Sequence, residues 1–422
     1  MTGPRPALAA WPDAPPQAAS QSAWERPIVA HRHRGTSEPP LILLLSAAHP
    51  PDDIRVVRKE GAALAAAGWR VRHLAPAGPA PAGPAPAVVD GVAIETYRRR
   101  PGWRGRILGI PALARRAAAS GAAVLHASEP DAWLAALLAG RATGARVVLD
   151  VHEHYPSRLD ARLPVPLRPV ARAGLRLLCR LAGRAAAAVV VAKDGLDADF
   201  AAPGRTIAVR NYAMPVPIQP RRHTPGPLTL AHAGALGRAR GWPQMLGALA
   251  LAPPGTRLRL IGRFTDGSEA EFVAEAATLG LASRIECLPW LPYAEALARL
   301  AECDIGLVLF QPGDENHRLA LPHKLFDCML AGLPVIAPVF GPEVAAVIRD
   351  AGCGVLVDAA SPAAIAAAVL ELADPDRRAA LGAAGRHAAL TRYGWAGEAA
   401  RLVALYQRLA PVPVGAAART AL

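Results

Sequence analysis

The chain has few cysteines, and their spacing is irregular. Only five occur in 422 residues, and no two of them form a Cys-x-x-Cys pair. Disulfide frameworks and structural zinc sites both need closely and regularly spaced cysteines. The pattern therefore excludes these two classes and favours a reducing compartment, so we expect a cytoplasmic protein. The cysteines are Cys179, Cys287, Cys303, Cys328 and Cys353.

Long uncharged apolar runs are also absent from the sequence. A membrane-spanning helix needs about 20 consecutive apolar residues, and no run of that kind occurs. The first residues lack the charged region and the apolar region of a signal peptide. We therefore expect neither a transmembrane helix nor a secretory signal.

Aromatic residues make up only 5% of the chain, and lysine is scarce. The formal net charge is nevertheless +13 and the pI is about 10.4, because arginine supplies nearly all of the positive charge. Such a charge favours anionic partners, for example nucleotide phosphates or anionic lipid. No zinc spacing, helix-turn-helix pattern or aromatic-basic RNA motif accompanies it, so we expect no nucleic-acid partner. The lysines are Lys59, Lys193 and Lys324.

Hydrophobic residues make up 52% of the chain, in short apolar runs that alternate with amphipathic stretches. Residues 41–45 form an apolar run typical of a buried parallel strand; a predicted helix at 55–67 and a second strand at 70–74 follow. This alternation predicts an α/β fold. Further strands are predicted at 124–126, 147–151, 188–191, 207–209, 228–232, 258–261, 285–288, 305–309, 335–337 and 355–357. Further helices are predicted near 107–119, 131–142, 168–184, 361–373, 375–389 and 395–409.

The composition divides the chain into two ordered halves. Residues 1–39 are rich in Pro, Ala, Ser and Arg without periodicity, which predicts a disordered tail. Prolines interrupt the pattern at 211–227, which we interpret as a linker between domains at 40–210 and 228–394, with a second tail at 410–422. Two doubly wound halves imply a cleft, with ligands at the carboxyl ends of the strands that face it.

The most informative stretch is residues 321–337, which reads as a loop, an amphipathic helix, a Gly-Pro stop and a short strand. Lys324 and Asp327 lie three residues apart at the predicted helix start, and therefore on one face. A helix N-terminus attracts anions, and a lysine there adds charge for a phosphate. A carboxylate one turn further can accept hydrogen bonds from sugar hydroxyls. The combination indicates a nucleotide-sugar site.

This segment resembles the donor-site helix of glycosyltransferase family 4 (group 1), retaining enzymes of the GT-B fold, whose pattern is roughly P-x-K-[LF]-F-E-x-[ML]-x-x-G-x-P-V-[IV]. The resemblance implies two Rossmann-like domains with a cleft between them, and a C-terminal helix, 395–409, that crosses back onto the first domain. Two positions depart from the pattern. Asp327 replaces the Glu that binds the ribose, and Leu319 stands where many members carry another Glu.

Two segments of the first half resemble the acceptor side of this family. Residues 49–60 resemble the family's D-x-R-[VI]-x-[RK]-E segment, which implies that Asp53 and Arg55 face the cleft. A capped helix with surface charges is the alternative interpretation.

Residues 147–156 end a predicted strand with polar side chains, where α/β sheets place their sites. The family commonly shows D-x-H-E or H-D there, which implies that His152 and Glu153 lie on the acceptor side and that His152 lies near the reacting sugar. A buried, satisfied histidine is the alternative. Two histidines on one strand are too few ligands for a metal, so no metal site is predicted.

The loop at 233–242 matches the family's G-x-L-x-x-x-[RK]-G pattern. Small residues let the backbone approach a diphosphate, and an arginine supplies a permanent bidentate charge. By resemblance, Arg240 and Lys324 form a diphosphate clamp, whereas an ordinary strand-to-helix turn is the alternative. The predicted donor-binding residues are Gly234, Arg238, Arg240, Arg263, Lys324 and Asp327; the predicted catalytic residues are His152, Arg240 and Lys324.

An arginine repeats every four residues along the predicted helix at 168–184, beside several leucines. A basic amphipathic helix is typical of elements that bind a membrane surface, so we expect peripheral attachment to anionic lipid of the inner leaflet. A solvated helix face is the alternative. The arginines are Arg168, Arg172, Arg176, Arg180 and Arg184.

We interpret the chain as a bacterial glycosyltransferase that moves a hexosyl or other sugar from a nucleotide-diphosphate sugar to a carbohydrate or lipid-linked acceptor. The resemblance implies retention at the anomeric carbon, no metal and no cofactor, and we place the activity in envelope polysaccharide or glycolipid synthesis. One alternative is an inactive GT-B scaffold, motivated by Leu319 and Asp327, and another is a basic binding protein. An epimerase or a sugar phosphorylase shares the fold, but a phosphorylase carries a pyridoxal lysine, and lysine is scarce here.

Overall fold

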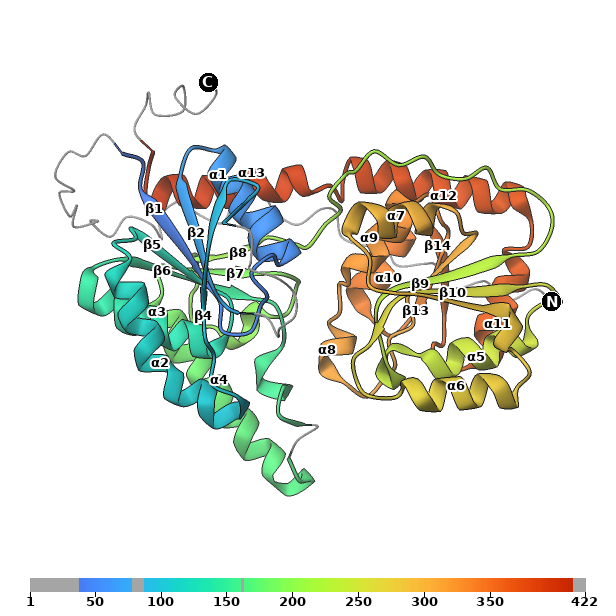
Figure 1. The fold of residues 1–422 in the computed structure, drawn as a ribbon, viewed down its shortest axis with the longest axis horizontal. Helices are drawn as coiled ribbons and strands as arrows, with labels where there is room; N and C mark the ends of the chain where they lie inside the picture. Colours follow the sequence, from blue (N-terminus) through green and yellow to red (C-terminus); the bar gives the residue numbers. More distant parts are fainter. Residues whose placement is uncertain (1–37, 78–86, 161–162, 413–422) are drawn as a thin grey trace, which may run out of the picture.

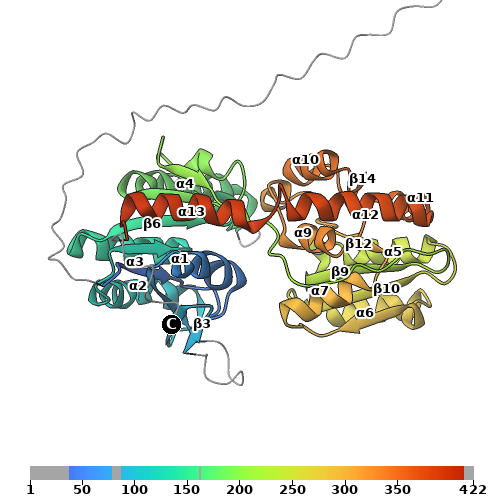
Figure 2. The ribbon, with the colours of Figure 1, turned by 90° about the horizontal axis from the view of Figure 1, so that it is seen from above.

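The computed structural model describes residues 38–77, 87–160 and 163–412 (Figure 1). The predicted tails at 1–39 and 410–422 lie outside the described residues except for 38–39 and 410–412. The chain forms two sheets, and helices cover both faces of each (Figure 2). All the strands predicted above are present, although their ends differ by a few residues.

The first sheet has eight strands in the order β3-β4-β2-β1-β5-β6-β7-β8, all parallel except β3. Two of these strands, β3 and β4, were not predicted. They form a hairpin across Asp90 and Gly91, whose positive φ angles of 47° and 81° fit the two-residue turn typical of an Asp-Gly pair. The strands are β1 (Leu41–Leu45), β2 (Arg70–Pro76), β3 (Val88–Val89), β4 (Val92–Tyr97), β5 (Val124–Ala127), β6 (Arg146–Val151), β7 (Ala188–Val191) and β8 (Thr206–Ala208).

Helices of the first half pack on both faces of this sheet. One face carries α2, α3 and α4, and the other carries η2, α1 and the last helix of the chain. The α-helix predicted at 55–67 begins instead with eight residues of π-helix, which is often found at functional sites. The helices are η2 (Ile54–Gly61), α1 (Ala62–Ala66), α2 (Gly102–Ala119), α3 (Pro130–Thr143), η3 (Tyr155–Ser157), η5 (Val165–Leu167), α4 (Arg168–Ala185) and η6 (Asp197–Asp199).

The second sheet has six parallel strands in the order β11-β10-β9-β12-β13-β14. Helices α7, α9, α10 and α12 pack on one face, and α5, α6 and α11 pack on the other. The strands are β9 (Thr229–Leu236), β10 (Arg257–Phe264), β11 (Ile285–Leu288), β12 (Ile305–Leu307), β13 (Val335–Pro338) and β14 (Gly354–Val357). The helices are η7 (Arg238–Arg240), α5 (Trp242–Leu251), α6 (Glu269–Thr278), η8 (Ala282–Arg284), α7 (Tyr293–Ala301), α8 (Glu315–Arg318), α9 (His323–Leu330), α10 (Pro342–Ala351), α11 (Pro362–Glu371) and α12 (Pro375–Leu390).

Strand β9 is longer than predicted, so Gly234 lies within it rather than in the loop that follows. Gly234 pairs with Gly262 of β10, and a Cβ atom on Gly262 would lie 2.0 Å from the carbonyl oxygen of Gly234. Both glycines also have positive φ angles, of 93° and 151°. Glycine is therefore required at both positions if the two strands are to approach so closely at their carboxyl ends.

The last helix, α13 (Trp395–Leu409), crosses back onto the first half, as predicted (Figure 2). The chain returns at Ala213, whose carbonyl accepts a 2.7 Å hydrogen bond from the amide of Trp395. At the far end of the helix, the Tyr406 hydroxyl lies 2.6 Å from Nδ1 of His126, and Trp69 donates to the carbonyl of Ala410. The first half is thus completed by the C-terminal helix. None of the helices described is both long enough and apolar enough to cross a bilayer.

Candidate functional site

Lys324, in the first turn of α9, reaches the carboxyl end of β9. Its Nζ donates a 2.8 Å hydrogen bond to Nε2 of His232 and lies 3.5 Å from the carbonyl of Ala235. Its side chain passes over Gly234, where an added Cβ would lie 3.8 Å from its Cε. Burial, assisted by the charge of Arg240, lowers the pKa of Lys324 to about 7. The lysine is therefore held in place by His232 and Ala235, and not by any carboxylate in the described part of the chain.

Arg240 lies beside Lys324 at the end of η7. Its guanidinium is 4.6 Å from the centre of the Phe310 ring, and Lys324 Nζ is 5.9 Å from the same ring. Neither cation forms an ion pair with a carboxylate among the residues that the structure describes. Burial also lowers the pKa of Arg240. Two converging cations without a counter-charge favour the binding of an anion.

Asp327 lies one turn after Lys324 on α9. Its Oδ1 accepts a 3.1 Å hydrogen bond from the Tyr293 hydroxyl, and its Oδ2 is 2.8 Å from Nδ1 of His323. Burial, followed by the charge of Asp327, raises the pKa of Tyr293, so the phenol remains a donor. The carboxylate is thus fixed in orientation by two neighbours, as a ligand-binding group needs to be.

The two other arginines predicted on the donor side lie elsewhere. Arg238 is exposed; it donates to Glu271 at 2.8 Å and stacks on Trp242. The structure does not bring Arg238 to Arg240 and Lys324, because Glu271 on α6 holds it on the outer surface. Arg263 lies in β10 and stacks on Trp290 at 5.2 Å, where it lines a pocket of about 340 Å³ beside the carboxyl ends of β10 and β11.

On the other half of the molecule, His152 follows the end of β6. Its Nδ1 lies 3.2 Å from Nε2 of His49, and its Nε2 contacts the Asp150 carboxylate. Burial alone would lower the pKa of His49, but its 2.5 Å hydrogen bond and ion pair with Glu129 raise it to about 9. A doubly protonated His49 then donates to both Glu129 and His152. Nε2 of His152 lies between the Asp150 carboxylate and Nε of Arg55, which donates a 3.0 Å hydrogen bond to it.

Asp53, Arg55 and Glu153, predicted on the acceptor side, have different surroundings. Asp53 caps η2 by accepting 2.9 Å hydrogen bonds from the amides of Arg55 and Val56. Arg55 points into the interior rather than into open space, because it pairs with two buried carboxylates. Glu153 is partly buried and pairs with Arg158 at 2.9 Å. Of the four predicted acceptor-side residues, Arg55 and His152 contact each other and both contact Asp150.

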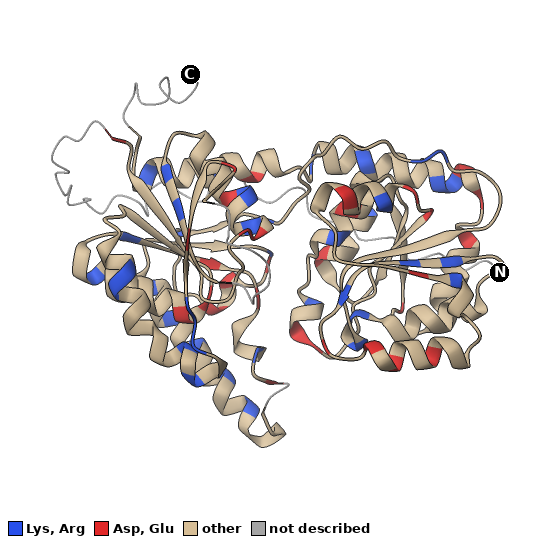
Figure 3. Ribbon diagram, viewed as in Figure 1, with Lys and Arg blue, Asp and Glu red and all other residues tan. Residues whose placement is uncertain are grey.

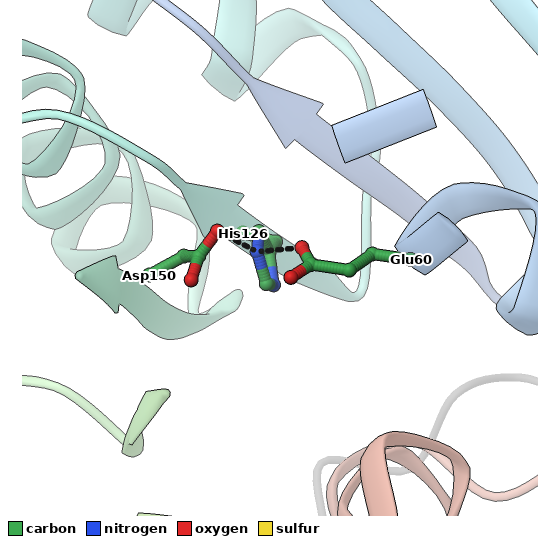
Figure 4. A group of neighbouring side chains, drawn as sticks. All are labelled: Glu60, His126 and Asp150. Carbon is green, nitrogen blue, oxygen red and sulfur yellow. Dashed lines mark ion pairs between the residues drawn. The ribbon is translucent and has the colours of Figure 1, made fainter. Parts of the chain in front are cut away.

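The buried carboxylates belong to a cluster of Glu60, His126 and Asp150 (Figure 4). His126 Nε2 lies 3.2 Å from Glu60 and 3.4 Å from Asp150, while Arg55 lies 2.8 Å and 3.1 Å from the same two residues. Burial would lower the pKa of His126, but hydrogen bonds to Asp150 and Glu60 raise it to about 9. Two carboxylates thus balance two cations. Three metal-ligand side chains meet here, but Arg55 already supplies the charge that a metal would bring, so the group does not fit a metal site.

Several residues of these networks were not selected from the sequence, and His232, Glu129 and His49 are three of them. His232 is a buried histidine inside the apolar run of β9, and a histidine in such a run was the available signal. Glu129 precedes Pro130 at the start of α3, directly after β5, and reads as an ordinary helix start. His49 lies inside the segment 49–60 but matches no position of the family pattern.

The two halves contact each other close to these groups. The amide of His154 donates a 2.7 Å hydrogen bond to Oδ1 of Asn316, and the amide of Asp194 donates to Glu343 at 3.0 Å. Leu319 is buried in the core of the first half, and its Cδ2 would lie 3.2 Å from a Cβ on Gly195. At the position where the family often carries Glu, this chain therefore makes an apolar contact between the halves.

Solved structures with the same architecture are glycosyltransferases of the GT-B fold. Sucrose-phosphate synthase from Thermosynechococcus elongatus is 18% identical and superposes with a TM-score of 0.68 over 88% of this chain and 99% of its own. Anabaena HepE, solved with UDP and glucose, is also 18% identical, with a TM-score of 0.66 over 87% of this chain and 100% of its own. At this identity the likeness establishes the GT-B fold.

Two family models match the chain in succession: Glycosyltransferase Family 4 at residues 55–198 and Glycosyl transferases group 1 at residues 228–374. The matches together cover more than half of the chain, and the protein therefore belongs to the family 4, group 1 glycosyltransferases.

Two curated relatives match shorter stretches of the chain. The D-inositol 3-phosphate glycosyltransferase of Thermobispora bispora is 34% identical over 177 residues, 39% of each chain. The GDP-mannose-dependent alpha-(1-6)-phosphatidylinositol monomannoside mannosyltransferase of Mycolicibacterium smegmatis is 33% identical over 144 residues, 27% of this chain and 37% of its own. The matches span less than half of each relative.

Proposed function

We propose that the protein transfers a sugar from a nucleotide-diphosphate sugar to an acceptor hydroxyl. The observation that carries this proposal is the pair of converging cations, Arg240 and Lys324, at the carboxyl end of β9. Their shared position beside Phe310, next to Gly234 at the end of β9, suits the negative charge of a diphosphate. The departing diphosphate gains negative charge in the transition state, and fixed cations stabilise it without needing to reorganise.

In this proposal the remaining residues have separate roles. Asp327 accepts hydrogen bonds from the ribose of the nucleotide, and Gly234 lets the backbone approach the diphosphate. His152 contacts the reacting sugar or the acceptor hydroxyl. Transfer proceeds with retention, without a metal or another cofactor, because the two cations carry out the electrostatic work that a metal performs in other transferases.

We further propose an acceptor in envelope polysaccharide or glycolipid synthesis. Both curated relatives are named for inositol-containing acceptors, one an inositol phosphate and the other a phosphatidylinositol glycolipid. The phosphatidylinositol glycolipid is a membrane substrate, which agrees with the basic surface described next.

Helix α4 supports attachment to the inner face of a membrane (Figure 3). Three of its arginines have partners within the protein: Arg168 donates to the carbonyl of Leu163, Arg172 pairs with Asp160 and Arg176 pairs with Asp199. Arg180 and Arg184 are exposed, as are the apolar side chains of Val170, Leu177 and Leu181. We therefore expect these apolar residues, with Arg180 and Arg184, to contact anionic lipid.

Nucleotide binding tests the proposed function and separates it from an inactive scaffold that has lost the donor site. The melting temperature of the full chain is measured with UDP, GDP, ADP, dTDP and CMP, beside Lys324→Ala and the control Arg257→Ala. Arg257 is exposed at the opposite end of the same sheet, in the first position of β10. We expect one nucleoside diphosphate to stabilise the wild type and the control but not Lys324→Ala. No shift with any nucleotide would contradict the proposal.

A further inference from the structure

An arginine-lined pocket opens on the first half, away from Arg240 and Lys324. It has a volume of about 270 Å³ and lies between the carboxyl end of β4 and helix α2. Six arginines line it, against a single acidic residue, Asp131. The arginines are Arg98, Arg99, Arg100, Arg106, Arg115 and Arg116.

Most of this positive charge is not balanced within the protein. Asp131 is used by Arg106, which binds it through two 2.7 Å hydrogen bonds, and Arg116 lies 4.0 Å from Glu95. The other four arginines of the pocket have no carboxylate partner among the residues that the structure describes. Four unpaired arginines that line one pocket concentrate positive charge there, and an anion with several oxygens would balance it.

The pocket adjoins the network that holds His152. Arg99 donates a 3.1 Å hydrogen bond to the carbonyl of Ala47, a residue that lines the pocket, and the amide of Ala47 donates to Glu129 at 2.8 Å. Glu129 in turn binds His49, which contacts His152. Because the carboxyl ends of β1, β4 and β6 share one edge of the sheet, a ligand in this pocket can extend toward His152.

We propose that this pocket binds the phosphate or diphosphate group of the acceptor. The inference rests on the proposed transferase function and names the acceptor class: a hydroxyl compound that carries a phosphoryl group. A volume just below the usual range of about 300–1,000 Å³ for small-molecule sites suits a head group rather than a whole acceptor. Guanidinium groups, with paired donors in a rigid fork, match phosphate oxygens better than they match sugar hydroxyls.

Two sources present the same chemistry: a soluble phosphorylated compound and the head group of a lipid. The outer face of α2 exposes Trp103, Ile107 and Leu108 next to the pocket, an arrangement that suits a lipid-linked acceptor. The phosphoryl group is common to both sources, so the test first measures its binding and then distinguishes the sources.

The first arm titrates inorganic pyrophosphate into the full chain by calorimetry. All proteins carry Lys324→Ala, so that the proposed donor site does not contribute. Three variants are made in this background. The alanine triple changes Arg98, Arg100 and Arg115 to Ala, and the lysine triple changes the same three residues to Lys. The control is Arg141→Ala, on the outside of α3. We expect the alanine triple to weaken binding by about tenfold or more, since one hydrogen bond to a charged group contributes a factor of that order. The Arg141 control binds pyrophosphate within about threefold of the background. The lysine triple, which keeps the charge but lacks the paired donors of a guanidinium group, binds more weakly than the background and more tightly than the alanine triple.

Equal binding by the alanine triple and by the Arg141 control would overturn the proposal. The three arginines are exposed, so an unchanged melting temperature of the triple verifies that its fold is intact. The proposed function is tested separately, in proteins that keep Lys324. There the rise in melting temperature caused by a nucleotide depends on the second half of the chain and not on the pocket. If no nucleotide stabilises the wild type, the proposed donor site is refuted, and the pyrophosphate result for the pocket still stands.

The second arm uses vesicles of phosphatidylcholine with and without phosphatidic acid, a lipid with a phosphomonoester head group. A lipid source is supported if binding to the phosphatidic acid vesicles is lost in the alanine triple, is kept in the Arg141 control and is inhibited by pyrophosphate. Vesicle binding that the triple retains, together with its loss of pyrophosphate binding, would support it with a soluble source.

Discussion

In the first half, the buried carboxylates of Glu60 and Asp150 lie between Arg55 and His126, and each charge has a partner within hydrogen-bond distance. In the second half, Arg240 and Lys324 share the Phe310 ring, and neither has a carboxylate partner among the described residues. A closed network of charges stabilises one conformation, whereas unbalanced charges reduce stability until a ligand arrives. The comparison therefore separates groups that hold a scaffold from groups that await an anion.

The largest expected effect comes from breaking the closed network. Glu60→Gln keeps the shape of the side chain but leaves Arg55 and His126 with less counter-charge in a fully buried site. We expect a loss of about 3–5 kcal/mol in the free energy of unfolding, the usual result of removing one partner of a buried ion pair. Chemical denaturation measures it, with the exposed Glu275→Gln on α6 as control. A loss no greater than that of the control would show that the network contributes little stability.

The next largest effect is expected at Lys324, where a substitution should reduce activity but not stability. Lys324→Met removes a partly buried, unpaired cation, so we expect the melting temperature to stay the same or rise. Transfer activity falls by about 10²–10³ in kcat, the usual cost of losing one fixed group that stabilises developing charge. The two readouts move in different directions, which a mutation that merely unfolds the protein cannot produce. Near-normal turnover would contradict the assigned role.

The sequence was sufficient to predict all the strands except β3 and β4, the two halves and the returning helix, because buried parallel strands appear in it as apolar runs. The hairpin was missed because β3 is a two-residue edge strand and β4 is mostly exposed or half-buried, so neither strand forms an apolar run. Lys324, Arg240 and Asp327 were predicted from family patterns. The position of Arg238 was not predicted correctly, because it depends on a contact with Glu271, a residue far from it in the sequence. The pocket of six arginines likewise forms only when β4 and α2 come together.

The apolar contact between the halves allows a smaller test of the comparison. Leu319→Ala removes side-chain atoms from the core of the first half, next to Gly195. We expect a loss of about 2 kcal/mol in stability, near the lower limit for a buried leucine, because the site lies between two domains and can partly close. Thermal unfolding measures it, with the exposed Leu370→Ala as control. No difference between the two variants would show that Leu319 does not join the halves in solution.

The smallest expected effect is a proton taken up when the donor binds. Burial lowers the pKa of Lys324 to about 7 in the free protein, from an ordinary value of 10.5. Its protonated form therefore costs stability below pH 7, and this cost disappears as the pH rises from about 7 to 10.5. A bound diphosphate favours the charged lysine and raises its pKa again. At about pH 8 we expect nucleoside diphosphate binding to take up close to one proton, measured by calorimetry in buffers of different ionisation enthalpy. Lys324→Arg, which stays protonated, should bind without this uptake, and an unchanged uptake in that variant would assign the proton to another group.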